Sequence, residues 1–506
     1  MMKEEYIKKF WTKLLASSKS VNKIPTEYLQ EAFNARIYDW WIWPRKWKLE
    51  LVNSVVWTNN KGGFILDSKL YQITNSKIYL IENWGQDEKV DLGYDKRTDI
   101  LTYWSFVIIV ADWESLQVFD WTNLTTPTTV PTSNNGIIEY TRWFSFLASS
   151  NILYISRPIT EANPEYAYDF TWTDSENITF DSEITWLKGT LNWIYIFTKE
   201  KVEFIWANSL QSVAWSATFI STPIWNWWEP VNNLSIVASW DKIFYVTKNQ
   251  QINTINYVSW IETAQIWELS QKPIVWIREY LKNIDIVQEN AFWFYNQNDE
   301  TIQFHLRKEN SIYNNVVIVY DLVNTTFSID TWKNYNYVVK NGLEYYWFSD
   351  LNSSIYIDNV WWSDNGSAIP FKIKTQAMNY WNLREKMFWW ILTAWAIWPD
   401  TNLKYNVFLD RQSVFSEDIE WQASFISDIG EVWWNAIWET PIWWDIWYNK
   451  WEIIPFERIW DEWRMYNLGT RAEIEILSNS NIQDFIIDTL WLRLEHSSNM
   501  DISNKF

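Results

Sequence analysis

The sequence contains no cysteine and only two histidines, His305 and His496. Without thiols the chain cannot form a disulfide framework or a thiolate metal site. Two histidines are too few for a His-based zinc cluster, and a catalytic triad that uses His is not expected. The sequence therefore predicts no catalytic, metal-binding or cofactor-binding residues, and no cofactor.

Glycine is also scarce. The 506 residues include 10 Gly and 44 Trp, whereas proteins ordinarily contain about 7% Gly. Many Trp occur in turn contexts, where Gly is favoured because it adopts positive φ without a Cβ clash. They follow Asp or Asn at Trp40, Trp113, Trp121, Trp193 and Trp227, lie between Ser239 and Asp241 at Trp240, and form the pairs Trp40-Trp41, Trp227-Trp228, Trp361-Trp362, Trp389-Trp390, Trp433-Trp434 and Trp443-Trp444.

We interpret many of these positions as glycine in the organism. The codon UGA specifies Gly in some bacterial lineages and Trp in other genetic codes, so an alternative genetic code would exchange the two. The Gly share would then rise somewhat above the ~7% norm, as suits a turn-rich β protein. We expect most of the Trp in Asp-Trp, Asn-Trp and Trp-Trp contexts to lie in turns and to be unusually exposed for that residue type. The alternative is a truly Trp-rich protein whose indoles stack on sugars.

Long hydrophobic runs and a basic charge are missing as well. No run of about 18 apolar residues occurs, so no membrane span is predicted. The N-terminus lacks an apolar region of signal-peptide length. The formal charge of −20 argues against general affinity for nucleic-acid phosphates. A negative surface would let DNA slide past without sticking, or would simply keep the protein soluble.

Alternating strand patterns are abundant, and the stretch from Glu183 to Trp206 is typical of them. Ile194 and Ile196 alternate with Tyr195 and Phe197, and a short polar turn leads into a second strand with Val202 and Phe204. This pattern predicts a hairpin of two half-buried strands.

Similar units recur from about Leu49 to Asn359 at a spacing of roughly 40–50 residues, the period of four-stranded propeller blades. One such sheet cannot bury both of its faces alone, whereas radial packing around an axis covers them. We therefore predict an all-β chain with a β-propeller of about six to seven blades. Two stacked β-sandwiches are the competing architecture, for which shorter and more regular strand spacing is expected.

The two ends of the chain have a different character. Tyr6, Phe10 and Leu14 lie at helical spacing within residues 3–18, and a second helical turn is predicted from Pro25 through Ala32. After Pro370, alternating segments predict a β-sandwich-like domain of about 130 residues. The predicted organisation is a short N-terminal helix and lead-in segment (1–48), a β-propeller (49–365) and a C-terminal β-sandwich-like domain (366–506).

Several segments carry a resemblance to known proteins when Gly replaces Trp. Residues 32–51 then read AFNARIYDGGIGPRKGKLEL, which resembles the lead-in segment of phage tail nozzle and packaged-DNA-stabilisation proteins. Asn34, Trp40, Trp41, Arg45 and Trp47 hold the motif positions. The segments ITWLKGTLNWIYIFTKEKVEFIW, VFDWTN and TPIWNWWEPVNNLSIVASWDKIFYV resemble recurrent sequences of phage tail propellers, and the matches span most of residues 34–360.

The resemblance implies a structural virion protein of the tail hub, nozzle or DNA-stabilisation type, and not an enzyme. It implies a homo-oligomeric ring below the portal that forms or plugs the DNA exit channel. Its partners would be portal, adaptor and tail proteins, with phage DNA passing without sequence-specific binding. The location would be the virion, assembled in the bacterial host cytoplasm. The alternatives are a carbohydrate-binding or carbohydrate-cleaving β-propeller, such as a tail spike or surface lectin, and a bacterial scaffold propeller with no virion role.

Residues that could carry chemistry have simpler interpretations. No Walker loop, GxSxG elbow, HExxH motif, EF-hand loop or deaminase signature is present. A glycosidase pair requires two carboxylates roughly 5–10 Å apart, which sequence alone does not reveal. We expect His305 to be a packed or edge residue of a strand. We expect solvated turn acceptors at Asp112, Glu114, Asp120, Asp350 and Asp358.

Overall fold

The computed structural model describes residues 5–6, 29–38, 41–45, 48–52, 60–82, 85–103, 105–141, 144–170, 177–190, 193–206, 222–224, 234–240, 242–249, 251–258, 263–269, 281, 290–308, 310–331, 333–358, 368–375, 386–397, 402–410, 412–420, 450–455, 468–469, 472–479 and 485–496. The regular elements formed by these residues are almost entirely β-strands, with a short 3-10 helix, η2 (Pro164–Tyr168). The all-β class predicted from the sequence is confirmed.

Most of the strands form four-stranded antiparallel sheets that follow one another along the chain. The first sheet contains β6 (Asn60–Leu66), β7 (Lys69–Thr74), β8 (Lys77–Glu82) and β9 (Gly85–Asp91). The second contains β10 (Thr98–Thr102), β11 (Val107–Ala111), β12 (Gln117–Phe119) and β13 (Leu124–Thr125). The third contains β14 (Ile138–Thr141), β15 (Phe144–Ser149), β16 (Ile152–Ile155) and β17 (Ile178–Thr179).

The series continues in the same way. The fourth sheet contains β18 (Ile184–Gly189), β19 (Trp193–Thr198), β20 (Val202–Trp206) and β21 (Thr222–Ile224). The fifth contains β22 (Ile236–Ser239), β23 (Lys242–Val246), β24 (Ile252–Val258) and β25 (Thr263–Glu268). Another is made of β30 (Tyr335–Asn341), β31 (Glu344–Ser349), β32 (Ile355–Asp358) and the early strand β5 (Lys48–Val52). Between the fifth sheet and this last one lie β26 (Phe292–Asn296), β27 (Thr301–Leu306), β28 (Val316–Asp321) and β29 (Thr326–Thr331), which belong to a larger sheet.

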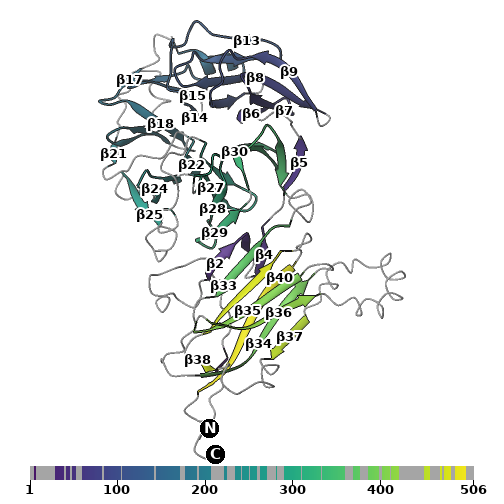
Figure 1. Cartoon of the computed structure of the whole chain (residues 1–506). Helices are drawn as coiled ribbons and strands as arrows, with labels where there is room; N and C mark the ends of the chain where they lie inside the picture. The colour runs from purple at the N-terminus through teal and green to yellow at the C-terminus, as the bar shows by residue number, and fades with distance from the viewer. Residues whose placement is uncertain are drawn as a thin grey trace, which may run out of the picture.

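The units close into a ring, which is the arrangement of a β-propeller (Figure 1). Their first strands, β6, β10, β14, β18, β22, β26 and β30, contact one another in chain order, and β30 returns to β6. Six of the units are separate four-stranded sheets. Strands β26–β29, which are part of the nine-stranded sheet, form the remaining blade of the ring. Strand β5 completes the last unit by pairing with β32, with Leu49 opposite Ile357. The predicted propeller of about six to seven blades is thereby confirmed, and the chain closes it with an N-terminal strand.

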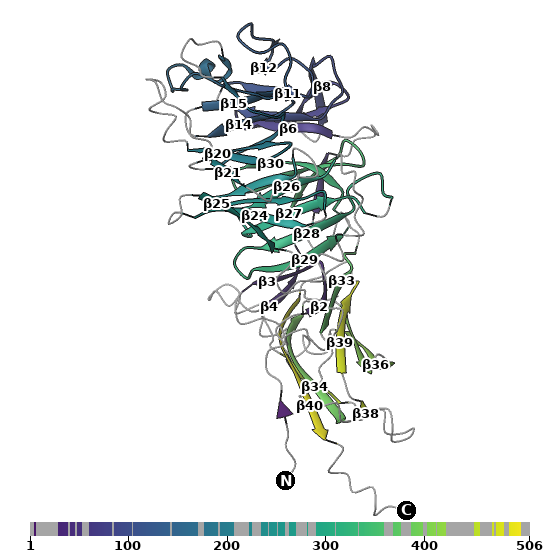
Figure 2. The same ribbon diagram turned by 90° about the vertical axis from the view of Figure 1, so that its left-hand side faces the viewer.

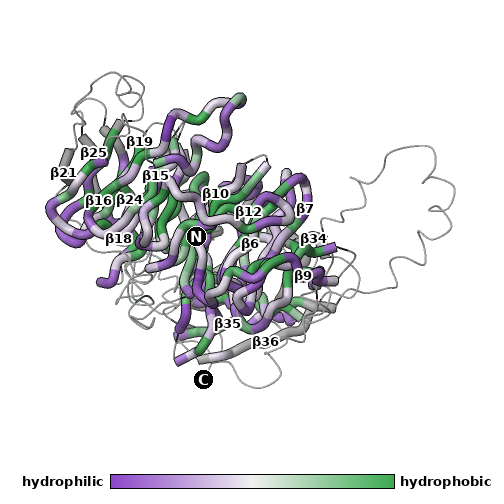
Figure 3. Tube along the Cα trace, turned by 90° about the horizontal axis from the view of Figure 1, so that it is seen from above, coloured by the Kyte–Doolittle hydropathy of each residue, from purple (hydrophilic) through white to green (hydrophobic). Residues whose placement is uncertain are grey.

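The predicted hairpin at Glu183–Trp206 shows why the sheets stack in this way. Strands β19 and β20 pair as expected. The prediction that they are half-buried is wrong, because Ile194 through Phe197 are all buried. Ile194 and Ile196 pack in a cluster with the preceding blade, whereas Tyr195 and Phe197 pack with the following one. Each blade therefore buries both faces against its two neighbours. In Figure 3 hydrophobic segments run along these strands, and hydrophilic segments gather at the loops.

Two further sheets extend from one side of the propeller (Figure 2). The nine-stranded sheet continues from β29 into β2 (Leu29–Phe33), β33 (Phe371–Thr375), β39 (Ala472–Ser478), β35 (Asn402–Leu409) and β36 (Gln412–Glu420). The seven-stranded sheet contains β3 (Ala35–Tyr38), β4 (Trp41–Pro44), β40 (Phe485–His496), β34 (Lys386–Ile397), β37 (Lys450–Pro455), β1 (Glu5–Tyr6) and β38 (Leu468–Gly469). The two sheets give the C-terminal region its sandwich-like, sheet-rich character.

One hydrophobic core passes from the propeller into this region. It contains Phe304 and Ile318 of the blade β26–β29, Leu29 of β2, and Ile373 and Tyr405 of the C-terminal strands. Because β2 pairs with β29 on one side and β33 on the other, hydrogen bonding is also continuous across the junction.

The predicted N-terminal helices are not found in the described residues. Glu5–Tyr6 form strand β1, which pairs with β40, and Leu29–Phe33 form strand β2, which pairs with β33. Local helical spacing is outweighed here by burial in a sheet, since Leu29 and Ala32 are fully buried in the common core. The remainder of residues 3–18 and 25–32 lies outside the described residues.

The Trp-containing turn contexts divide into two groups. Trp113, Trp121 and Trp240 lie in turns, as predicted. For Trp41, Trp193, Trp389 and Trp390 the prediction of a turn is wrong, because these residues lie in β4, β19 and β34. Trp40, Trp227, Trp228 and the pairs at 361–362, 433–434 and 443–444 lie outside the described residues.

Candidate functional site

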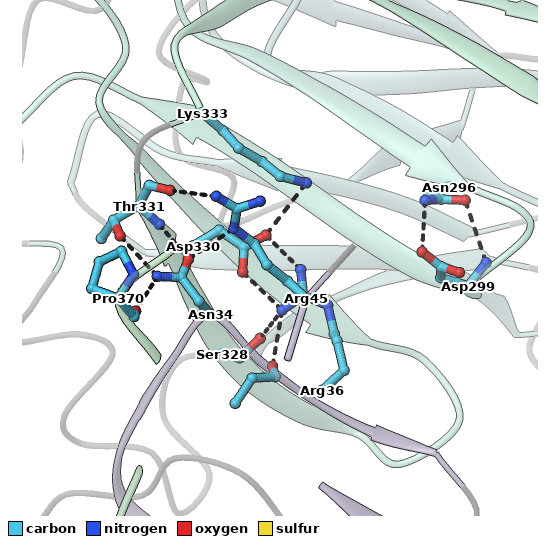
Figure 4. Close-up of polar contacts among 11 residues, drawn as sticks. Asn34, Arg36, Arg45, Asn296, Asp299, Ser328, Asp330, Thr331, Lys333 and Pro370 are labelled. Carbon is cyan, nitrogen blue, oxygen red and sulfur yellow. Dashed lines mark hydrogen bonds and ion pairs between the residues drawn. The ribbon is translucent and has the colours of Figure 1, made fainter. Parts of the chain in front are cut away.

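Asn34, in the N-terminal segment that resembles phage proteins, directly follows β2, the strand that pairs with β29 of the propeller and with β33 of the C-terminal region. Its side chain is surrounded by polar contacts (Figure 4). Asn34 links β2 to β3 with φ 53°, a conformation that Asn tolerates better than most residues. Its Nδ2 donates to Pro370 O (2.6 Å) and Thr331 Oγ1 (3.0 Å). Its Oδ1 accepts from Thr331 N (2.9 Å) and Arg45 Nε (3.0 Å). All four hydrogen-bonding positions of the amide are thus used.

Arg45, which directly follows β4, is hydrogen-bonded to Asn34 and to Thr331. Its side chain is almost completely buried, and its backbone N–H donates to Asn34 O (2.8 Å). Its Nη2 donates to Thr331 O (3.2 Å), at the end of the outermost strand of the blade β26–β29. Asn34 and Arg45 together therefore hold the lead-in segment against the propeller and against the chain at Pro370.

A buried ion pair lies beside these hydrogen bonds. The Arg36 guanidinium makes two bonds to the Asp330 carboxylate, Nη1 to Oδ1 at 2.8 Å and Nη2 to Oδ2 at 2.6 Å. Lys333 Nζ lies 3.6 Å from Asp330 Oδ2. Burial alone would raise the pKa of Asp330, but the positive charges of Arg36, Lys333 and Arg45 hold it at about 2. We call Asn34, Arg36, Arg45, Asp330, Thr331 and Lys333 the junction network.

A second set of charged side chains comes from the first strands of the blades, which surround the propeller axis. Asp99 of β10 accepts from Ile138 N of the next blade (3.0 Å) and from Ile100 N (3.0 Å). Glu139 of β14 binds Lys188 Nζ and accepts from Gly189 N (3.3 Å) of the blade after that. These carboxylates satisfy backbone groups at the inner edges of neighbouring blades.

Arg97 extends the same set across the ring. Its guanidinium donates to Ala291 O (3.3 Å) and Asn336 O (2.9 Å), two groups near the starts of β26 and β30. We call Arg97, Asp99, Glu139 and Lys188 the axial cluster. Burial, and next the neighbouring Glu139 charge, raise the pKa of Asp99 to about 7. Asp99 and Glu139 are two nearby carboxyl groups, but each is engaged in bonds that join blades.

Of the carboxylates singled out from the sequence, Asp350 lies near Arg97 of the axial cluster, and the others belong to neither set. Asp112 and Asp120 are exposed in turns, and Asp120 Oδ1 accepts from Asn123 N (2.8 Å), as expected of a turn acceptor. Glu114 pairs with Lys96 (2.5 Å). Asp350 was expected to be solvated, and this is wrong: it is buried and accepts from Asn314 N (2.7 Å) and Asn290 Nδ2 (2.8 Å). Burial raises the pKa of Asp350 to about 6. Asp358 ends β32.

His305 lies inside β27 and is packed, as expected. Its ring is fully buried and stacks on Phe292, with ring centroids 4.3 Å apart. Burial, followed by the charge of Lys333, lowers its pKa well below the usual value. Neither ring nitrogen has a hydrogen-bond partner within the described part of the chain. Among the described residues no three His, Cys, Asp or Glu side chains are grouped so as to hold a metal ion.

Sequence reasoning therefore found Asn34 and Arg45 but missed Arg36, Asp330 and the axial cluster. Arg36 and Asp330 are 294 positions apart, and a lone Arg or Asp in a strand carries no local signal. Asp99, Glu139 and Lys188 occupy first strands of successive blades, so an alignment of the blades by their first strands was the one signal available. Trp40 and Trp47, which share the motif with Asn34, lie outside the described residues, and Trp41 begins β4.

Comparison with known proteins assigns the chain to no family. No family model matches the sequence, and no curated protein matches it. Among solved structures, the chain is similar to BamB from Moraxella catarrhalis, at 9% identity and a TM-score of 0.38, covering 60% of this chain and 83% of that one. It is also similar to YCF48 from Cyanidioschyzon merolae, at 6% identity and a TM-score of 0.38, covering 62% and 98%. In the described residues no helix is long and apolar enough to cross a membrane.

Proposed function

We propose that the chain is a structural subunit of a phage virion, of the tail hub, nozzle or DNA-stabilisation type. Copies would assemble as a ring below the portal and form or plug the DNA exit channel. The junction network is the observation that carries the proposal. Asn34 and Arg45, two residues on which the resemblance to these phage proteins rests, hold the propeller, the lead-in segment and the C-terminal sheets together.

The architecture suits a load-bearing role. A continuous core and a continuous hydrogen-bonded sheet run from the blade β26–β29 into the C-terminal strands, so force on one region passes to the other without a flexible linker. The axial carboxylates hold blades together. In this proposal the working partners are further copies of the chain and neighbouring portal, adaptor and tail proteins, with DNA passing by without sequence-specific contacts.

The test is the oligomeric state together with the presence of the protein in virions. We expect the purified protein to sediment as a closed ring of several copies, and peptides of the chain to be stoichiometric components of purified phage particles. A strictly monomeric protein that is absent from particles would contradict the proposal and would favour a bacterial scaffold propeller.

A carbohydrate-binding or carbohydrate-cleaving propeller is the second candidate, and exposed indoles favour it. Trp113 and Trp240 are 70% and 78% exposed, and free indole faces stack on sugar rings. On this alternative, Trp113→Ala and Trp240→Ala would each reduce binding on a glycan array. Leu343→Ala, at an 81% exposed apolar position in a comparable turn, is the matched control and would leave binding unchanged.

A further inference from the structure

Three tryptophans have a backbone conformation that their side chain opposes. Trp113 has φ 61°, Trp121 has φ 81° and Trp240 has φ 55°, all in the left-handed region. An L-residue is disfavoured there because its Cβ approaches the following carbonyl oxygen, at a cost of roughly 1–2 kcal/mol. The other non-glycine residues in this region of the described chain are polar: Asn34, Asp67, Ser68, Asn75, Ser76, Ser150, Glu300, Asn310, Thr325 and Asp410. Trp is thus the one hydrophobic residue type that occurs there in the described residues.

The turns themselves favour Gly, Asn or Asp at these positions. Trp240 opens a two-residue hairpin loop, because Ser239 and Lys242 pair directly across it. In the blade β30–β32, Asn341 pairs with Glu344 across the equivalent loop, and Gly342 occupies the first position with φ 62°. The same position of two equivalent loops therefore holds Gly in one blade and Trp in another, with nearly the same φ.

Trp113 occupies a turn of a different kind. Glu114 N donates to Ala111 O (3.1 Å), which places Trp113 third in a four-residue β-turn. Positive φ at this third position is the mark of a type II turn, which calls for Gly or Asn. Trp121 follows Asp120 in a turn where Asp120 N donates to Asn123 O (3.1 Å), so it has positive φ at the second position, as in the primed turns.

Side-chain packing does not offset the strain at two of these sites. Trp113 and Trp240 are 70% and 78% exposed, whereas Trp186, Trp293 and Trp347 are buried within strands. Trp347 stacks on Tyr335 with ring centroids 5.1 Å apart. Trp121 is only partly exposed, and its Nε1 donates a hydrogen bond to Ser105 O (3.0 Å). The chain thus contains Trp that packs in cores and Trp that occupies turns at positive φ.

We propose that residues 113, 121 and 240 are glycine in the protein as its own organism makes it, through UGA codons read as Gly. The exposed indoles of Trp113 and Trp240 are then absent from the natural surface, and the sugar-stacking alternative loses the feature that favoured it. The proposal is independent of the virion role: a monomeric protein that is absent from particles would leave it intact, because it concerns the identity of single residues.

The decisive measurement is peptide mass spectrometry of the protein isolated from its natural source, together with sequencing of the gene. We expect glycine masses at positions 113, 121 and 240 and UGA at their codons. Tryptophan masses at 113 and 240, or UGG codons there, would overturn the proposal.

A stability experiment on the chain as written tests the backbone argument separately. Trp113→Gly is compared with Trp113→Ala, since both remove the exposed indole and only Gly removes the Cβ. We expect the unfolding equilibrium constant of the Gly variant to be about threefold to tenfold lower than that of the Ala variant, measured by urea denaturation. The same comparison at 240 should agree, whereas Trp347→Gly should be strongly destabilised. Equal stability of the Gly and Ala variants at both turns would contradict the backbone argument.

Discussion

At the scale of single residues, the junction network consists of buried polar groups that have several partners each. Asn34 uses every hydrogen-bonding position of its amide, and Asp330 is enclosed by Arg36 and Lys333 with almost no exposure to water. Breaking a buried pair leaves an uncompensated charge, which costs far more than losing an exposed pair. Asn34 and Arg45, two positions of the motif that resembles phage proteins, are thus also structural determinants of the junction.

Asp330→Asn should lower the free energy of unfolding by about 3–5 kcal/mol, because the charges of Arg36 and Lys333 would remain buried beside a neutral amide. Asp87→Asn is the matched control: Asp87 pairs with Lys89 at 2.6 Å, but its side chain is 68% exposed, so a change of under about 1 kcal/mol is expected. Urea denaturation measures both. Equal effects of the two substitutions would show that Asp330 is not held in a buried pair.

The raised pKa of Asp99 makes stability depend on pH in a predictable direction. A carboxyl group whose pKa is higher in the folded than in the unfolded protein contributes stability below its ordinary pKa near 4, and this contribution is lost as pH rises through about 7. Asp99→Asn should therefore reduce the decline of stability between pH 4 and pH 7.

Asp91→Asn serves as the control for this effect. A bond from Gly93 N, and next one from Ser76, lowers the pKa of Asp91, so Asp91 titrates below this pH range. Its substitution should leave the slope between pH 4 and pH 7 unchanged. If Asp99→Asn also leaves the slope unchanged, Asp99 is ionised throughout the range. Thermal melts at several pH values give the slopes.

At the scale of elements, the short N-terminal strands β2 to β5 join sheets that are otherwise formed by later parts of the chain. β5 completes the last blade, β2 joins the blade β26–β29 to the C-terminal sheet, and β3 and β4 enter the second sheet. A propeller closes when its final sheet is completed by a strand from the other end of the chain, so that separation of the blades also requires this strand to detach.

Removal of residues 1–52 should therefore open the ring. We expect this truncated protein to lose cooperative unfolding and to be digested rapidly by protease, because β2 to β5 and the Asn34 contacts are all deleted. Removal of residues 1–28 is the control, since it keeps β2 to β5, and it should retain a cooperative transition. If the two truncations behave alike, strand β5 does not close the propeller.

At the scale of the whole molecule, the propeller and the C-terminal sheets share one core instead of meeting at a surface. The nine-stranded sheet contains strands of both regions, and one hydrophobic cluster includes buried residues from both. Separate domains joined by a linker unfold separately, whereas regions that share a core are coupled.

Calorimetry should accordingly record one unfolding transition for the whole chain, with the calorimetric and van't Hoff enthalpies in agreement. Urea unfolding followed by far-UV circular dichroism and by tryptophan fluorescence should give coincident curves. Two resolved transitions would mean that the shared sheet does not couple the propeller to the C-terminal region.

The alternation of apolar residues and the spacing of the hairpins determined the all-β class and the propeller, since strand period and blade period are local properties of the chain. Local sequence was misleading at Leu29–Phe33, where a helical turn was predicted through Ala32 and a strand buried in a shared sheet is found. Alternation also suggested half-buried strands, because it does not show whether a second blade covers the face that carries Tyr195 and Phe197.

Tertiary structure alone decided the long-range pairings. Arg36 meets Asp330 across 294 positions, and β5 meets β32 only when the ring closes. Which carboxylates titrate abnormally was decided in the same way, since burial and neighbouring charges raise the pKa of Asp99 and lower that of Asp330. The sequence itself contains the residue types and their local periodicity. The dielectric surroundings of a side chain and its distant partners are established only when the sheets pack together.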